Sequence, residues 1–329
     1  MVTGQINQIE NIKYLKPQKE WGWQVAVYLF LAGIGAGSLA FGILMDWLGY
    51  APHPLRPMLL WGPILVAIGA LFLVLKLGIK RRFLNTILNP KTSWLSRGFY
   101  ILSMCIVVGA LIFGISLLPF LDVDISSWSS LILILEVIGF ILALATAVYT
   151  GILIQSVKYV PLWNTYFLPA LFTVSALSTG AMAVIMSALG YSMMTPSSIS
   201  PQQVIDLLIP TEQIIIVVEA IVLFLYLFSR YKAEYEGRIS VRMLLSGKLK
   251  FIFWLGIVVS GFVFPVILEF LHSKFSDYSS LLFLGGLFSF IGGFSLRYGV
   301  IYAGIKEQHP LPKWIELKNN IVASKENLI

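Results

Sequence analysis

The sequence predicts an all-α membrane protein with eight transmembrane helices, and three observations support this fold class. Of the 329 residues, 58% are hydrophobic and only 12% are charged, whereas a soluble domain carries about 25% charged residues. The mean hydropathy is +0.85. The apolar residues also gather in runs of the length, about 20 residues, that a helix needs to cross the hydrocarbon core.

Eight such runs follow one another along the chain. They occupy residues 23–45, 57–79, 98–120, 131–155, 166–190, 211–229, 249–271 and 280–303. A polar segment, 1–20, precedes them and a polar tail, 305–329, follows. Because residues 1–20 have no apolar core and the first run is longer than that of a signal peptide, we expect no cleaved signal.

The first run contains Gly33, Gly35 and Gly37. A dinucleotide-binding glycine loop lies between a strand and a helix, whereas these glycines lie inside one continuous apolar run. Gly33 and Gly37 instead form a GxxxG pair, which favours close approach of another helix. The last run has a similar stripe, at Gly285, Gly292 and Gly299 with Gly286 and Gly293 beside it.

The basic residues predict the orientation. All but three of the 23 Lys and Arg residues fall in the segments at the end where the first run begins; the exceptions are Arg56, Lys274 and Arg297. Since basic loops stay inside the cell, both termini are expected in the cytoplasm, as in a multi-pass protein of the cell membrane. The opposite side carries the Ser- and Pro-containing loops 121–130 and 191–210. This pattern accounts for the net charge of +7 without a nucleic-acid partner.

The chain offers few ligands for redox cofactors. Cys105 is the only cysteine, and the three histidines, His53, His272 and His309, lie at span ends or in loops. An iron–sulfur cluster needs several cysteines and a membrane haem needs axial ligands at depth. We therefore expect no haem, no iron–sulfur cluster and no metal site, so that any electrons pass through partner subunits.

Ionisable residues inside spans are costly and are functional candidates. They are Glu136, Glu219, Glu269 and Arg297. Glu136 and Glu269 lie toward the opposite side, Arg297 toward the N-terminal side, and Glu219 between them, so the carboxylates are candidates for a proton path. The alternative is structural, with each glutamate paired to a hydroxyl, an amide or an arginine of a neighbouring helix.

A second set of candidates lies at the N-terminal side. Gln24 and Tyr28 are one helical turn apart on the same face of the first span, and Tyr149, near the far end of the fourth span, reaches the same surface. Rings and hydrogen-bonding groups of this kind suit a quinone head group, although spacing alone indicates it only weakly. Trp23 is also a candidate, but with Trp21 and Trp94 it fits an interfacial aromatic belt.

Five stretches, in order, resemble the NrfD/PsrC family, the membrane subunits of polysulfide reductase and related molybdopterin oxidoreductases. They are WGWQVAVYLFLAGIGAGS (21–38), NPKTSWLSRG (89–98), YTGIL (149–153), PALFTVSALSTG (169–180) and GGFSLRYGVIYAG (292–304). One match would be weak, but the ordered set, from 21 to 304, is specific.

The resemblance implies two four-helix bundles, 21–155 with a menaquinone or ubiquinone site and 156–304. It also implies a ferredoxin-like iron–sulfur partner and a molybdopterin catalytic subunit. Tyr149 matches the family's quinone-contacting tyrosine, and Arg297 matches its last-span arginine. The family's polar position in the first span falls on Val25, so Gln24 or Tyr28 would replace it. Many members serve exported catalytic subunits, in tension with the cytoplasmic orientation that the charges predict.

Three hypotheses follow. The favoured one is a quinone-reactive membrane anchor of a respiratory complex, which exchanges electrons with the iron–sulfur partner and, if the carboxylates form a path across the membrane, couples this exchange to proton movement. The second is an ion-coupled secondary transporter, although the sequence lacks the matching pair of broken helices typical of that class. The third is a purely structural anchor. No complete active site for a terminal substrate is visible in the sequence.

Overall fold

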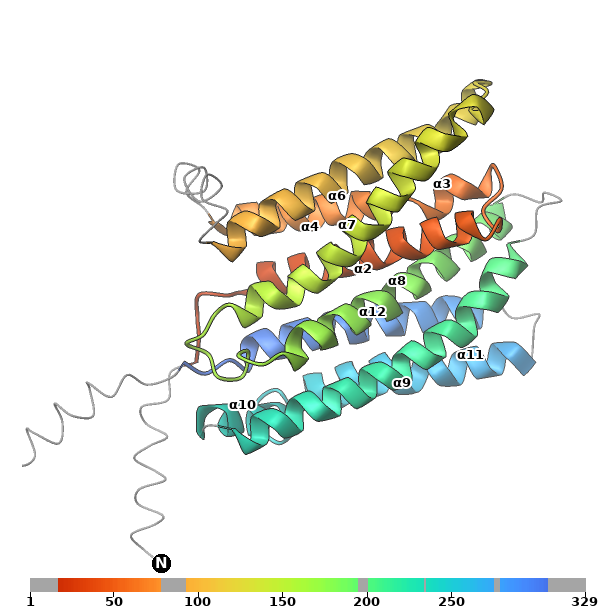
Figure 1. Cartoon of the computed structure of the whole chain (residues 1–329). Helices are drawn as coiled ribbons and strands as arrows, with labels where there is room; N and C mark the ends of the chain where they lie inside the picture. The colour runs from red at the N-terminus through yellow and green to blue at the C-terminus, as the bar shows by residue number, and fades with distance from the viewer. Residues whose placement is uncertain (1–16, 78–92, 195–200, 234, 275–278, 307–329) are drawn as a thin grey trace, which may run out of the picture.

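A computed structural model describes residues 17–77, 93–194, 201–233, 235–274 and 279–306 (Figure 1). Within these ranges, eight helical segments are long and apolar enough to cross a membrane. They are Trp23–Trp47, Leu55–Lys76, Trp94–Leu121, Ser126–Gln155, Phe167–Met193, Gln202–Lys232, Ile252–Lys274 and Ser279–Tyr302. The predicted fold class is confirmed: this is an all-α, multi-pass membrane protein.

Most spans are single helices, and two are interrupted. The single ones are α2 (Trp23–Trp47), α6 (Trp94–Leu117), α7 (Ser129–Gln155), α8 (Phe167–Met194), α9 (Gln202–Lys232) and α12 (Ser279–Tyr302). The second span consists of α3 (Leu55–Leu59) and α4 (Gly62–Leu77), and the seventh of η3 (Ile252–Val263) and α11 (Phe264–Lys274). The short 3₁₀ helices η1 (Leu118–Leu121) and η2 (Ser126–Trp128) link α6 to α7, and α10 (Tyr235–Leu245) follows α9.

The helices run back and forth along one axis, and α2 and α8 form the centre (Figure 1). Within the most apolar stretch of each span, 78% of α2 and 72% of α8 is buried, against 28% for α9 and for the spans that contain α6 and α7. The outer helices therefore present their apolar side chains to lipid. Helices α4 and α7 pack on one part of α2, and α9 and α12 pack on α8. The boundary between two bundles at residue 155 stays a prediction.

We call the end where α2 begins the N-terminal end. There α6, α8 and η3 also begin, and α7, α9 and α12 finish, with α10 beside them (Figure 1). Residues Pro17 and Ile305 form an isolated antiparallel bridge, and the Gln18 amide N–H donates to the Gly304 carbonyl at 3.0 Å. The two ends of the described sequence therefore meet. The predicted polar segments lie mostly outside the described residues, at 1–16 and 307–329, as does the start of the 89–98 motif.

Glycines let the central helices touch through their backbones, as the GxxxG pair predicts. A Cβ atom at Gly37 of α2 would lie 2.0 Å from the Ala176 carbonyl oxygen of α8, and one at Gly180 would lie 2.3 Å from the Gly37 carbonyl carbon. In the last span, a Cβ at Gly292 would lie 2.1 Å from the Gly261 Cα of η3. Close packing at both predicted stripes is thereby confirmed.

The structure corrects one predicted loop and adds two features that the sequence did not indicate. The loop predicted at 191–210 is wrong in extent, because α8 continues to Met194 and α9 begins at Gln202. Pro210 lies inside α9, which a membrane helix tolerates when neighbouring groups satisfy the freed carbonyl. The segment between spans six and seven contains α10, which was not predicted from the sequence. The seventh span begins as a π-helix, and Ser260 Oγ there donates to the Leu255 carbonyl five residues back at 2.8 Å.

Candidate functional site

Two tyrosines from different helices lie in one buried cluster at the N-terminal end. Tyr28 lies in the second turn of α2 and is fully buried, and Tyr149, near the end of α7, is 2% exposed. Neither hydroxyl has a hydrogen-bond partner in the described part of the protein. Because buried polar groups are nearly always paired, two orphan hydroxyls in one buried cluster favour a ligand with acceptor oxygens.

Gly98 of α6 forms the slot that holds the Tyr149 ring. A Cβ atom at Gly98 would lie 1.7 Å from Tyr149 Cζ and 1.8 Å from its hydroxyl oxygen. No larger residue fits there unless the ring moves. The phenol of Tyr149 is thus held between α7 and α6.

Polar and aromatic groups surround the start of α2. The positions of Gln24 Oε1 and Lys76 Nζ are 2.9 and 3.6 Å from where a Cβ of Gly22 would stand. Trp23 is 50% exposed and meets Phe72 edge-on, with ring centroids 6.2 Å apart. Gln24 and Lys76 therefore lie at the surface, near the turn of α2 that carries Tyr28, while Trp23 keeps the position expected of an interfacial aromatic belt.

Arg297 of α12 forms a separate, deeper cluster. It is fully buried, and its Nη1 donates to Ser175 Oγ and to the Gly293 carbonyl, both at 2.8 Å. Its guanidinium lies over the rings of Phe172 and Phe30, 5.6 and 5.9 Å from their centroids. On α2 it reaches Gly33, about 7.5 Å along the helix from Tyr28.

Three buried carboxylates lie in the half of the protein formed by α8, α9, α11 and α12. Glu219 lines a small cavity of about 10 Å³ together with Ser175 and Ser178, enough for about one water. Ser178 Oγ donates to Glu212 at 3.1 Å, and the carboxyl of Glu212 faces that of Glu269. The acceptor of Arg297, Ser175, therefore borders a polar series that runs through Glu219 and Glu212 to Glu269. No cation forms a salt bridge with Glu212 or Glu269 among the described residues.

Glu136 belongs to a different group, at the opposite end. Arg56 of α3 forms salt bridges with Glu136 at 2.5 Å and with Asp46 at 2.7 Å. Trp47 Nε1 also donates to Glu136, at 3.0 Å. This side chain therefore has the paired partners that the structural alternative expects, and the structure does not bring it to Glu219 or Glu269.

An exposed network ties the two ends of the described sequence together. Glu20 accepts hydrogen bonds from Lys306 and from Tyr159, and these bonds lower the pKa of the Glu20 carboxyl. Gln18 adds a bond from its side-chain amide to the Ile301 carbonyl at 3.0 Å. The segments next to the tyrosine site are thus held in place.

Several residues near the candidate site and in the polar clusters were absent from the sequence-based candidates, mainly because some helices are longer than their apolar runs. Glu212 was next to the predicted start of its span, at residue 211. Helix α9 begins at Gln202, ten residues before Glu212, so this carboxylate lies within the helix and is buried. Asp46 and Arg56 were placed outside the spans. Lys76 was counted only as a basic loop residue. Pairs such as Glu212 and Glu219, seven apart on one helical face, were the available signal.

Comparison with known proteins decides the family. A family model described as "Polysulphide reductase, NrfD" matches residues 13–307. The protein belongs to the NrfD family. The C subunit of polysulfide reductase from Wolinella succinogenes is 29% identical over 308 residues, which span 86% of this sequence and 94% of that protein. Protein NrfD of Escherichia coli K12 is also 29% identical, over 306 residues, with the same two shares, 86% and 94%.

A third relative, the NrfD homolog of Haemophilus influenzae, is 25% identical over 320 residues, which span 89% of this sequence and 97% of that protein. The resemblance read from the five motifs is therefore confirmed at the level of the NrfD family.

Among the described residues, no group of three or more His, Cys, Asp or Glu side chains could hold a metal ion.

Proposed function

We propose that this protein is the membrane subunit of a respiratory complex and that it exchanges electrons and protons with a membrane quinone. One observation carries the proposal: Tyr28 and Tyr149 lie buried in one cluster at the N-terminal end, and neither hydroxyl has a partner among the described residues. The names of the relatives, a polysulfide reductase subunit and NrfD, support membership of a multi-subunit reductase.

The tyrosine site fits a quinone head group on chemical grounds. When bound, a menaquinone or ubiquinone supplies two-electron, two-proton redox chemistry. The phenols of Tyr28 and Tyr149 would donate hydrogen bonds to its carbonyl oxygens, and the slot at Gly98 holds the Tyr149 phenol in place. Gln24, at the start of α2, and Lys76, at the end of α4, would offer a further donor and a positive charge nearby. Trp23 packs at the lipid boundary beside them.

The substitution Tyr149→Phe tests this site. We expect quinone-linked electron transfer in the assembled complex to fall at least tenfold, because a hydroxyl donor to the reacting head group contributes roughly 10² or more to such steps. Gly98→Ala should reduce the rate similarly, since it displaces the ring without removing the hydroxyl. The measurement is quinol-dependent reduction of the iron–sulfur partner in membranes.

Tyr226→Phe is the matched control. Tyr226 is also fully buried near the N-terminal end, but its hydroxyl donates to the Leu162 carbonyl at 3.1 Å. Its variant should assemble and turn over normally. Normal turnover of Tyr149→Phe in an assembled complex would remove this tyrosine from the site.

A proton route in the second half of the protein is part of the proposal. Buried carboxyl groups that face each other without a cation hold a proton between them, because two bare charges in an apolar bundle are costly. Glu269, Glu212 and Glu219 form such a series toward Ser175 and Arg297. Arg297 supplies the positive charge at its inner end. Glu136, bound in its own ion pairs, takes no part in this version of the route.

The partners proposed are an iron–sulfur electron-transfer subunit, docked at the N-terminal end next to the tyrosine site, and a molybdopterin catalytic subunit beyond it. Gentle purification of the tagged protein followed by mass spectrometry should recover both partners and a quinone. Because this end is rich in basic residues, we propose that it faces the cytoplasm. A cysteine introduced at Lys158 that reacts with a membrane-impermeant thiol reagent added outside intact cells would contradict that orientation.

An ion-coupled secondary transporter is the second candidate. The same buried carboxylates and the π-helix η3, which lines the cavity at Glu219, favour it, since irregular helices often mark functional sites. Substrate uptake by vesicles that contain this protein alone would support the transporter. No uptake, together with quinone-linked turnover in the complex, would support the membrane anchor.

A further inference from the structure

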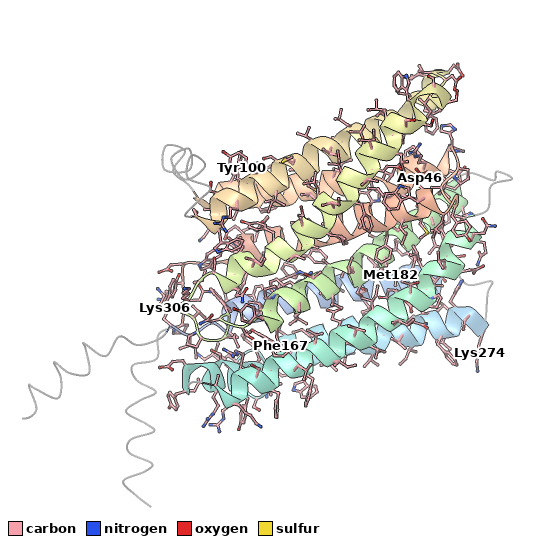
Figure 2. All side chains as sticks on the ribbon, in the orientation of Figure 1. Asp46, Tyr100, Phe167, Met182, Lys274 and Lys306 are labelled. Atoms are coloured by element: carbon pink, nitrogen blue, oxygen red, sulfur yellow. The ribbon has the colours of Figure 1, made fainter. Side chains whose placement is uncertain are left out.

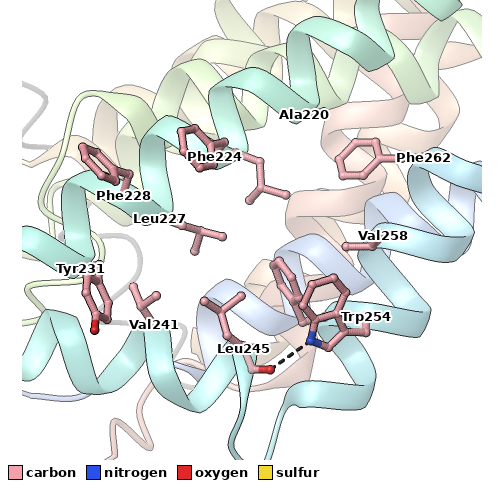
Figure 3. Close-up of a pocket in the computed structure, with 12 residues that line it drawn as sticks. Ala220, Phe224, Leu227, Phe228, Tyr231, Val241, Leu245, Trp254, Val258 and Phe262 are labelled. Atoms are coloured by element: carbon pink, nitrogen blue, oxygen red, sulfur yellow. Dashed lines mark hydrogen bonds between the residues drawn. The ribbon is translucent and has the colours of Figure 1, made fainter.

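A lipid-facing apolar groove lies between α9, α10 and η3, near the N-terminal end. Its volume is about 530 Å³, and Figure 3 shows its walls, with Phe224 and Phe228 from α9, Leu245 from α10 and Trp254 from η3. The indole of Trp254 donates to the Leu245 carbonyl at 3.0 Å and ties α10 to η3. Phe224 is 65% exposed and Trp254 is 52% exposed, so the groove opens to the surrounding membrane.

Helix α10 is amphipathic and lies at the membrane boundary. Val241 and Leu244 are buried against the bundle, whereas Arg238 and Arg242 are directed away from it. Short helices with one apolar face and basic residues on the other are typical of the lipid headgroup region. The groove therefore extends from the headgroup level into the apolar part of the membrane.

Three cations lie against rings that line the groove, and a fourth, Lys250, lies just before η3. Lys232 Nζ lies 4.2 Å from the ring centroid of Phe228, and the guanidiniums of Arg238 and Arg242 lie 5.8 and 6.0 Å from that of Tyr231. Phe228 and Tyr231 both line the groove.

Lys250 Nζ lies over the Phe251 ring at 5.1 Å. None of the four cations forms a salt bridge with a carboxylate in the part of the protein that the structure describes. Residues 230–250 contain six basic and two acidic side chains. The mouth is therefore strongly positive.

We infer that this groove binds an anionic phospholipid, with an acyl tail along its aromatic walls and the phosphate between Arg242, Lys250 and their neighbours. Basic pockets between membrane helices are typical sites for anionic headgroups. A quinone head group is uncharged and needs hydrogen-bond donors or acceptors at depth, whereas the lining residues, apart from the Tyr231 hydroxyl, are apolar. A second copy of the protein would bring an equal positive charge to the same mouth.

Native mass spectrometry of the detergent-purified protein tests the inference. Phosphatidylglycerol and phosphatidylcholine with identical acyl tails are added separately, and the bound lipid is counted. We expect phosphatidylglycerol to be retained roughly tenfold better, since each cation near an anionic headgroup adds to binding. The double variant R242Q/K250Q should lose this preference. Both side chains are exposed, so folding should be preserved.

The control K19Q/K158Q removes the same charge from exposed lysines elsewhere at this end and should keep the preference. Ala220→Phe, which fills the groove without changing charge, should weaken phosphatidylglycerol binding. Equal retention of the two lipids, or equal losses in both double variants, would overturn the inference. So would displacement of the lipid by added ubiquinone, or a dimer that forms through this face. The lipid preference tests the groove separately from the quinone site, because none of these variants changes Tyr28 or Tyr149.

Discussion

At the scale of single residues, the contrast among buried tyrosines identifies the candidate site. Tyr226 is fully buried and donates to the Leu162 carbonyl, so its environment within the protein is complete. Tyr28 and Tyr149 are equally buried but have no partner among the described residues. Leaving a buried donor unpaired costs about 1–3 kcal/mol. A ligand that accepts from both hydroxyls would recover this free energy, which is the reason for placing a quinone there.

The carboxylates give a prediction at the same scale. If Glu269 and Glu212 carry protons, Glu269→Gln should reduce the protons moved per electron at least severalfold. Electron transfer in membranes made leaky to protons should persist within about twofold, because the tyrosine site is untouched. The measurement is the pH change on turnover of the complex reconstituted in sealed liposomes.

Asp206→Asn is the control for Glu269→Gln. Asp206 is an exposed residue of α9 whose carboxylate accepts a hydrogen bond from the Gln202 side chain at 2.8 Å. Proton yields that stay the same in Glu269→Gln and Glu219→Gln would instead support the structural role.

The sequence could predict how deep a residue lies along its own span, but not which residues of other helices it contacts. Tyr28 and Tyr149 were expected at one surface because Tyr28 lies near the start of the first span and Tyr149 near the end of the fourth, which returns to the same side of the membrane. The sequence could not reveal that Arg56 folds back to Glu136, because this contact joins α3 to α7 across 80 residues. Nor could it place Arg297 deeper than the tyrosines, since that depends on how α12 is seated against α2 and α8.

At the scale of elements, the apolar runs located every span but misjudged several ends. Hydropathy marks where lipid contact is required, whereas helices continue until their backbone groups find other partners. Helix α9 thus begins well before its apolar run, at Gln202. The π-helix η3 was unpredictable because its sequence, rich in Ile, Val and Phe, is equally compatible with an α-helix.

The contact between α2 and α8 gives an element-scale prediction. Gly37→Ala places a Cβ 2.0 Å from the Ala176 carbonyl oxygen, which forces the central helices apart and should cost about 1–3 kcal/mol of stability. Gly114→Ala in α6 is the control, because nothing lies within 4 Å of its Cβ position. Alanine there should be neutral or stabilise the helix by up to about 1 kcal/mol. Thermal unfolding in detergent compares them; equal melting temperatures would contradict the close packing.

At the scale of the whole molecule, two features share one end. The tyrosine site lies at the start of α2, and the basic groove lies beside α10, at the same N-terminal end (Figure 2 labels Lys306 and Tyr100 there, and Asp46 and Lys274 at the other). Composition predicted the membrane class because 58% hydrophobic residues exceed what a soluble core can bury. The charge distribution predicted a basic end, and the structure adds that part of this charge gathers around an apolar groove.

The most direct test of the quinone site is photolabelling of the complex in its native membrane with an azido-quinone, followed by peptide mapping. We expect label on the peptides that carry the start of α2 and the end of α7. Excess unlabelled quinone should compete for it, and Tyr149→Phe should weaken it. Label confined to the groove beside α10, or label at the tyrosines that excess quinone does not displace, would contradict a quinone site at Tyr28 and Tyr149.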